Sequence, residues 1–201
     1  MDYDTSITDN LFSFEEIDLL NQLIAEHCKN PERVVKSESG AYYTVGNDAE
    51  ALIKSKVYSC YDDNLILNIT MYDTHSPAYP HLDISSSGPD YSAYTFIIPL
   101  DTYNAHTIVF NEKVKSTETY VEYLKITTPY SPFRIDRAFY KQYLSHMMPT
   151  DIDRLSVELV YPWTKGSMVA FDRYKLHCSD NFLKNGLTNK KGIVIWSELK
   201  P

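Results

Sequence analysis

Residues 65–72 read Leu-Ile-Leu-Asn-Ile-Thr-Met-Tyr, and apolar side chains recur there at every second position. In an extended strand, successive side chains point to opposite faces. The odd-numbered residues of this stretch therefore share an apolar face, whereas Asn68, Thr70 and Tyr72 share a mostly polar one. The pattern predicts a strand that buries one face in a core and whose polar face either lines a cavity or meets solvent.

The rest of the chain surrounds this strand with predicted helices and further strands. Ser13 and Glu16 have the spacing of a capping box, which predicts a helix that ends at Asn30-Pro31. A second helix is expected from about 48 to 61. More strands are expected at 94–100, 107–110, 155–161, 167–171 and 190–199. Two helices followed by several short strands predict a mainly β sandwich or barrel with flanking helices.

We expect these elements to form one domain that spans residues 1–201. Helices within residues 13–61 would support a β core at 65–199. Segment 111–153, which is polar and rich in Tyr, would be an insertion folded over one end of a sheet, with a helix near 134–146. A chain of 201 residues has room for one sizeable core but not comfortably for two.

Composition and charge exclude several classes of function. The formal net charge is −8, and the 19 Lys and Arg are scattered, which argues against nucleic acid as a partner. No apolar run approaches the roughly 20 residues that span a bilayer, so no membrane partner is expected. The acidic N-terminus is unlike a signal peptide. The 3 cysteines lack a Cys-x-x-Cys pattern, which argues against disulfides and predicts a cytoplasmic location.

Two histidines and one aspartate have the pattern of a metal site. His81 and Asp83 form a His-x-Asp tripeptide, whose two outer side chains point the same way in an extended segment. The tripeptide alone is weak, because a turn histidine beside a solvated aspartate is common. However, His177 follows a predicted strand and turn much later in the chain. Two His and one carboxylate are the facial triad of non-heme Fe(II) oxygenases, which leaves coordination positions open.

A basic residue begins the last predicted strand. Residues 190–196 read Lys-Lys-Gly-Ile-Val-Ile-Trp, and a buried cation at Lys190 could hold the far carboxylate of a dicarboxylate co-substrate. Strand parity places Lys190 on one face with Gly192 and Val194. The adjacent Lys191 could take the role instead. For either lysine, the alternative is an ordinary solvated charge at a strand end.

With these motifs, residues 65–199 resemble the iron(II)/2-oxoglutarate-dependent oxygenase superfamily, in particular its compact prolyl-hydroxylase-like members. The resemblance implies a double-stranded β-helix, the jelly-roll of the cupin type. It implies Fe(II) at one open end, with His81, Asp83 and His177 as its catalytic ligands. It also implies 2-oxoglutarate and O2 as co-substrates, with ascorbate as an optional reductant.

The resemblance also suggests how the co-substrate is held. Lys190 would pair with the far carboxylate of 2-oxoglutarate, because family strands commonly place an aromatic residue six positions later, where this chain has Trp196. Related enzymes often have a Tyr at the position of Tyr72 that reaches the co-substrate. Asn68 and Thr70 share its face and are further candidate pocket residues.

Other titratable residues have simpler explanations. His75 and His106 are rival metal ligands, but the neighbours of His75 offer no carboxylate at the necessary spacing. Arg173 and Lys175 could form salt bridges with a substrate or lie in a surface turn. Cys178 is more simply a buried small apolar residue than a ligand.

The implied activity is hydroxylation of a peptide side chain, prolyl-like, or of a free amino acid or small metabolite, with release of succinate and CO2. The alternatives are a cupin-type metal-binding protein or dioxygenase that does not use 2-oxoglutarate, and a non-catalytic β-barrel binding module. The chain departs from the family at Asn104-Ala105-His106, where a Gly-rich lead-in is usual, and in the insertion 111–153. These departures leave the substrate open.

Overall fold

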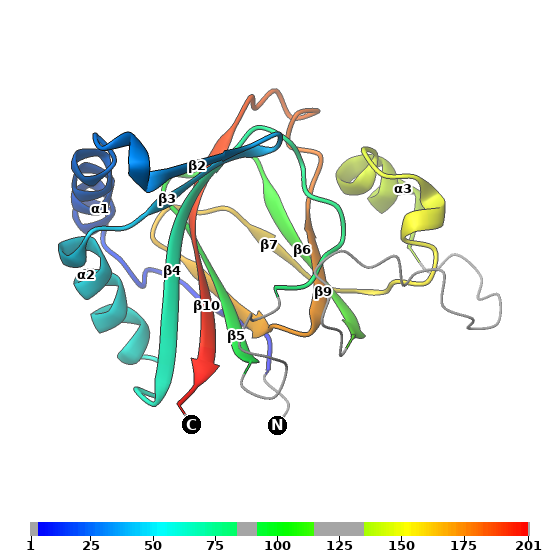
Figure 1. Cartoon of the computed structure of the whole chain (residues 1–201). Coiled ribbons are helices and arrows are strands. Elements are labelled where there is room, and N and C mark those ends of the chain that lie inside the picture. Colours follow the sequence, from blue (N-terminus) through cyan, green and yellow to red (C-terminus); the bar gives the residue numbers. More distant parts are fainter. Residues whose placement is uncertain (1–3, 84–91, 115–134, 201) are drawn as a thin grey trace.

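Two antiparallel β-sheets form the body of the protein in this computed structural model, which describes residues 4–83, 92–114 and 135–200. The larger sheet has the strand order β1-β8-β5-β10-β4-β3-β2, and the smaller has the order β7-β6-β9. Figure 1 shows the strands of the two sheets on opposite sides of a common interior. The strands are Ser6–Thr8 (β1), Val34–Ser37 (β2), Gly40–Thr44 (β3), Leu65–Thr74 (β4), Ser92–Pro99 (β5), His106–Lys113 (β6), Val157–Pro162 (β7), Met168–Asp172 (β8), Lys175–Ser179 (β9) and Lys190–Leu199 (β10).

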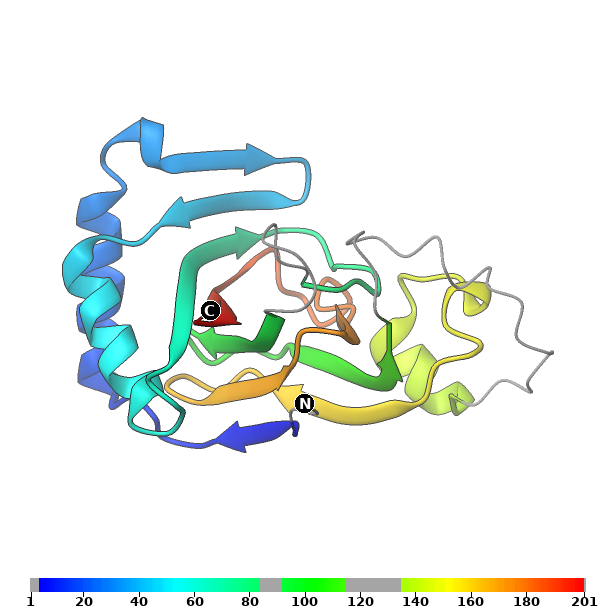
Figure 2. The ribbon, with the colours of Figure 1, turned by 60° about the horizontal axis from the view of Figure 1, so that its bottom comes forward.

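Two helices cover the outer face of the larger sheet. α1 (Phe14–His27) and α2 (Asn47–Tyr58) lie side by side there, as Figures 1 and 2 show. The predicted capping box of α1 is confirmed: the Glu16 N–H donates to Ser13 Oγ at 3.2 Å, and the Ser13 N–H donates to Glu16 Oε2 at 2.8 Å. The apolar stripe of α1 is buried against the sheet, which accounts for its helical spacing of apolar residues.

β4 confirms the predicted alternation. Leu65, Leu67 and Met71 pack in the core beneath the two helices. Along the opposite face the environment changes, because Asn68 is exposed whereas Tyr72 is partly buried against the apolar cluster between the sheets. The polar face of β4 is therefore exposed to solvent at Asn68 and faces the interior between the sheets at Tyr72.

The smaller sheet is covered on both faces. Its inner side contributes Val109 and Tyr161 to the cluster between the sheets. Its outer side packs against α3 (Arg137–Phe139) and the π-helical turn Tyr140–Leu144 that follows it. These helical turns lie beyond β6 and β9 in Figure 1, on the side opposite α1 and α2.

The expected elements are present with changed boundaries. The helix expected near 134–146 is a three-residue α-helix followed by a π-helical turn. β6 extends to Lys113, into the segment expected to be an insertion, and residues 115–134 of that segment lie outside the described residues. The short strands β1, β2 and β3 were not expected from the sequence, because they are too short and polar to show a clear period of two.

None of the helices that the structure describes is long and apolar enough to cross a membrane.

Candidate active site

His81, Asp83 and His177 come together at one place between the two sheets. Each offers one ligand atom, and these atoms all lie within 4.8 Å of one another. His177 Nε2 is 3.2 Å from Asp83 Oδ2, and the two imidazole ring centroids are 4.2 Å apart. Two imidazoles and one carboxylate directed at a common point are a suitable donor set for a divalent first-row metal such as Fe(II).

The backbone fixes the two histidines relative to each other. His177 lies at the centre of β9 and pairs with Val109 of β6. His81 lies outside the named strands but forms an isolated antiparallel bridge with His177. The smaller sheet therefore holds His177, and the backbone of His177 in turn holds His81.

Contacts of the second ring nitrogen set the orientation of each imidazole. His81 Nδ1 lies 2.7 Å from the Tyr79 carbonyl oxygen, and His177 Nδ1 lies 3.2 Å from the Lys175 carbonyl oxygen. A carbonyl can only accept, so Nδ1 is the donor in both rings, and in the neutral ring of His81 the Nε2 atom presents its lone pair. Burial and the neighbouring His177 lower the pKa of His81 to about 4, which keeps this ring neutral and able to bind a metal near pH 7.

The carboxylate of Asp83 is ionised and held by a buried hydroxyl. Burial alone would raise the pKa of Asp83, but the charge and hydrogen bond of His177, with a smaller effect of His81, bring it below 3.8. The hydroxyl of Thr95 donates to Asp83 Oδ2 at 3.0 Å. An ionised aspartate beside the neutral imidazole of His81 supplies two of the three ligands in the protonation state that metal binding requires.

The three residues line a cavity of about 420 Å³. Aromatic and hydroxyl side chains make up much of its wall, including Tyr42, Tyr72, Tyr79 and Trp196. Among the described residues that line it, Asp83 is the only carboxylate, and Lys190 is the only ammonium or guanidinium group. The cavity therefore contains one candidate metal centre and one fixed cation.

Lys190 and Lys191 point to different environments. Lys190 is 2% exposed and lines the cavity, with its Nζ 3.9 Å from the centre of the Trp163 ring and 5.2 Å from that of Phe182. Lys191 lies outside the cavity, and its Nζ is 3.6 Å from Asp73 Oδ2. The predicted parity of the strand is confirmed, because Lys190 and Val194 line the cavity whereas Lys191 and Ile193 do not.

No carboxylate of the described residues lies within ion-pair distance of Lys190 Nζ, so the ammonium group has no ion-pair partner among them. Burial lowers the pKa of Lys190 to about 8, although Asp180 and Cys178 act in the opposite direction. A lysine that is buried against two aromatic rings, without a paired anion, is suited to receive an anionic group from a ligand.

Of the three β4 residues predicted to line the pocket, Tyr72 lines the cavity, whereas Asn68 and Thr70 are not among its lining residues. Burial raises the pKa of Tyr72 well above 10, so its hydroxyl remains a neutral donor. Its ring packs edge-on against Trp163 at 5.9 Å.

The other candidates lie elsewhere. His75 is exposed, with Nε2 2.8 Å from the Glu38 carbonyl oxygen. His106 pairs with Asp180 at 2.8 Å. Cys178 is buried beside His177 and lines the cavity.

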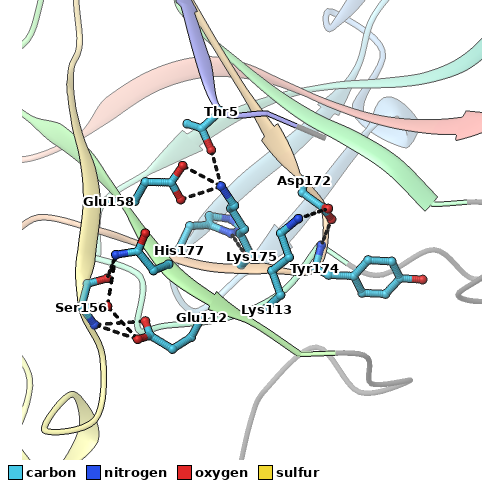
Figure 3. Close-up of polar contacts among 10 residues, drawn as sticks. Thr5, Glu112, Lys113, Ser156, Glu158, Asp172, Tyr174, Lys175 and His177 are labelled. Atoms are coloured by element: carbon cyan, nitrogen blue, oxygen red, sulfur yellow. Dashed lines mark hydrogen bonds and ion pairs between the residues drawn. The ribbon is translucent and has the colours of Figure 1, made fainter. Parts of the chain in front are cut away.

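Arg173 and Lys175 are both buried, which excludes the surface turn considered from the sequence. Figure 3 shows Lys175 next to His177, with its ammonium group against Glu158 and Thr5. The distances from Lys175 Nζ are 2.6 Å to Glu158 Oε1 and 2.7 Å to Thr5 Oγ1. Lys175 therefore has an ion-pair partner, whereas Lys190 has none among the described residues.

Sequence reasoning missed two buried threonines that support the site. Thr95 contacts Asp83, and Thr107 lines the cavity while its Oγ1 accepts the Trp163 Nε1–H at 2.9 Å. Both lie in predicted strands, where threonine is common, so no sequence signal distinguishes them.

Comparisons with known proteins agree with this architecture. The sequence matches no protein-family model and no curated protein. Among solved structures, the epimerase SnoN in complex with Fe3+, alpha ketoglutarate and nogalamycin RO matches with a TM-score of 0.62 and 11% identity, over 98% of this chain and 81% of that chain. The viral collagen prolyl hydroxylase vCPH from Paramecium Bursaria Chlorella virus-1, in its 2OG complex, matches with a TM-score of 0.52 and 13% identity, over 98% and 96%. An oxidoreductase of the 2OG-Fe(II) oxygenase family from Burkholderia pseudomallei matches with a TM-score of 0.55 and 10% identity, over 96% and 84%.

The chain therefore has the double-stranded β-helix fold of the 2-oxoglutarate- and iron-dependent oxygenases. The expected fold class, mainly β with flanking helices, is confirmed.

Proposed function

We propose that this protein is an Fe(II)- and 2-oxoglutarate-dependent oxygenase. His81, Asp83 and His177 would hold the iron, and Lys190 would bind the far carboxylate of 2-oxoglutarate. The observation that carries the proposal is one cavity that contains both a two-histidine, one-carboxylate set and a buried lysine that forms no ion pair with a described residue. A metal ligand set alone would fit many enzymes, but the second feature adds a site for an anion at a distance from the metal.

Iron with 2-oxoglutarate and O2 would supply the oxidative chemistry, which converts the co-substrate to succinate and CO2 and hydroxylates a C–H bond. The chain's own residues bind and orient the reactants. The Nδ1 contacts of the two histidines keep both Nε2 atoms directed at the metal position. Thr95 restrains the carboxylate of Asp83.

Four further side chains support the proposed carboxylate site at Lys190. Trp163 and Phe182 provide an apolar surrounding that strengthens the attraction between the ammonium group and an anion. Thr107 accepts a hydrogen bond from Trp163, so its own hydroxyl hydrogen is available to a ligand carboxylate. Tyr72, on the neighbouring wall, supplies another neutral donor.

The charge of the cavity favours a peptide-bound or otherwise uncharged substrate over a free amino acid. A free amino acid would bring an ammonium and a carboxylate group, and each would need a partner to leave water. Among the described lining residues, Asp83 and Lys190 are already assigned to iron and 2-oxoglutarate. The remaining described wall is aromatic, aliphatic or hydroxylated, which suits a prolyl-like or other neutral group.

The cupin-type alternative, a metal protein that does not use 2-oxoglutarate, leaves the buried charge of Lys190 without a role. For the location we propose the cytoplasm, since Cys28, Cys60 and Cys178 are all free thiols. We propose a small-molecule or peptide substrate as the partner rather than nucleic acid, because the chain carries a net charge of −8.

A thermal-shift experiment under anaerobic conditions tests the proposal. Ligands that bind only the native state raise the midpoint, by about 5–10 °C for a hundredfold excess over Kd in a chain of this size. Mn(II) should stabilise the protein, and 2-oxoglutarate should add stability only when Mn(II) is present. Stabilisation by Mn(II) alone would favour the cupin-type alternative, and no response to either would contradict a metal enzyme. The substrate can then be sought by mass spectrometry for oxygen addition, in matched peptides and free amino acids.

A further inference from the structure

Arg173 makes an unusual set of contacts for a residue in a turn. It lies between β8 and β9 and is only 2% exposed. Its Nε donates a short hydrogen bond to the backbone carbonyl of Asp83. Its Nη1 donates to the backbone carbonyl of Ser197 at 3.1 Å and lies 3.7 Å from Glu198 Oε1. One guanidinium thus joins the segment that carries a metal ligand to the last strand of the larger sheet.

Asp83 has more need of such support than the other two ligands. His177 is part of β9, and His81 is bound to His177 by the bridge between their backbones. Asp83 lies in neither a strand nor a bridge. Its side chain is restrained by the Thr95 hydroxyl, and its backbone is restrained by Arg173.

The chemistry of arginine fits this role. Burying a guanidinium is costly unless its donors are satisfied. Its rigid, planar fork donates in several fixed directions, which a lysine ammonium cannot reproduce. Here the fork spans two backbone carbonyls, and the one from Ser197 belongs to β10, the strand that begins with Lys190. Arg173 thereby connects the backbone of Asp83 to β10, the strand that also carries the proposed co-substrate lysine.

We propose that Arg173 is a positioning residue for the metal centre, which holds Asp83 in the geometry that binds the ion. The inference rests on the proposed function, because it requires that His81, Asp83 and His177 bind a divalent metal. Loss of the guanidinium would then weaken metal binding by a larger factor than its effect on folding explains. Removal of partners that orient metal ligands typically weakens affinity by about 10–100-fold.

The test compares two variants of the same region in the full chain. Arg173→Gln removes the fork. Lys113→Gln removes the ion pair between Lys113 Nζ and Asp172 Oδ2, 2.9 Å apart, at the residue before Arg173. Figure 3 shows this pair, which does not involve Asp83. The Kd for Mn(II) is measured by the electron paramagnetic resonance of the free ion, and stability of the metal-free protein is measured by urea denaturation.

We expect Arg173→Gln to raise the Kd for Mn(II) at least tenfold, and Lys113→Gln to leave it within twofold of the wild-type value even where it lowers stability. An unchanged Kd in Arg173→Gln would overturn the inference, as would an equal rise in both variants. If Arg173→Gln does not fold, Arg173→Lys is measured in its place, and a wild-type Kd there would also overturn the inference. Failure of the wild-type protein to bind Mn(II) would instead refute the metal centre, and with it the proposed function.

Discussion

His81 and His177 hydrogen-bond to each other through their backbones. The His81 N–H donates to the His177 carbonyl at 3.0 Å, and the His177 N–H donates to the His81 carbonyl at 3.1 Å. Residues far apart in the sequence are thereby placed directly opposite each other, with their imidazoles on the same side. The distance between the two proposed ligands is therefore set by a strand-like pairing rather than by the flexible side chains.

His177→Ala should abolish metal-dependent succinate formation and weaken Mn(II) binding at least a hundredfold, because two protein ligands remain of three. His75→Ala provides the control, since His75 is exposed and contacts Glu38 rather than the cavity. Both activities are measured as succinate released from 2-oxoglutarate with Fe(II). Succinate formation by His177→Ala at the wild-type rate would show that the metal lies elsewhere.

Lys190→Ala should raise the 2-oxoglutarate concentration needed for half-maximal activity by about a hundredfold, because a buried carboxylate would lose its charged partner. Lys191→Ala should change it less than twofold, because the Lys191 side chain lies outside the cavity near Asp73. The 2-oxoglutarate dependence of succinate formation distinguishes the two. The opposite result would mean that the co-substrate approaches from the other face of β10.

The affinity for 2-oxoglutarate should fall at alkaline pH. The pKa of Lys190 is lowered to about 8 in the ligand-free protein, and only its charged form attracts a carboxylate. Above that pH the apparent Kd should rise, by up to about tenfold per pH unit. Lys190→Arg should give a flat profile, because a guanidinium stays charged in this range.

The contribution of Lys190 to the stability of the ligand-free protein should increase over the same alkaline pH range in which the 2-oxoglutarate affinity falls. An unfolded lysine has a pKa of 10.5, so between about pH 8 and that value the unfolded chain binds more protons at this site than the folded one. The contribution of Lys190 to the free energy of unfolding therefore rises with pH. A 2-oxoglutarate affinity that stays constant from about pH 7 to 9.5 would contradict the assignment of Lys190.

Gly192→Ala should impair the same carboxylate site indirectly. A Cβ at Gly192 would lie 3.0 Å from Trp163 Cη2 and 3.2 Å from the Ile98 carbonyl oxygen. The Trp163 ring, on which the Lys190 ammonium lies, would have to move. We expect a loss of about 1–3 kcal/mol in the free energy of unfolding and about tenfold weaker 2-oxoglutarate binding, by urea denaturation and titration.

Gly186→Ala is the matched control for this substitution. Gly186 has a φ of +84°, and an added methyl group there meets open space. Its backbone strain should cost about 1 kcal/mol of stability without changing 2-oxoglutarate affinity. Equal effects of the two substitutions on 2-oxoglutarate affinity would mean that Trp163 does not contribute to the carboxylate site.

The sequence by itself determined the larger part of the fold and the choice of the three candidate metal ligands. The alternation at residues 65–72 is set by burial of one face of β4, and the capping box of α1 depends on residues three apart. Both are local signals that survive in the sequence. His81 and Asp83 are two residues apart, so they also form a short motif that can be found in the sequence. His177 supplies the second imidazole of the proposed ligand set.

Tertiary structure decided which neighbouring residues serve the site. The sequence left Lys190 and Lys191 open, and only pairing of β10 with β4 and β5 turns one lysine inward and the other outward. Thr95 gave no signal, and the sequence suggested for Arg173 only a substrate contact or a surface turn, because each acts on Asp83 across the interior and not along the chain. The physical reason is that periodicity reports which face of a strand is buried, whereas a partner for a particular buried atom is chosen by contacts between segments distant in sequence.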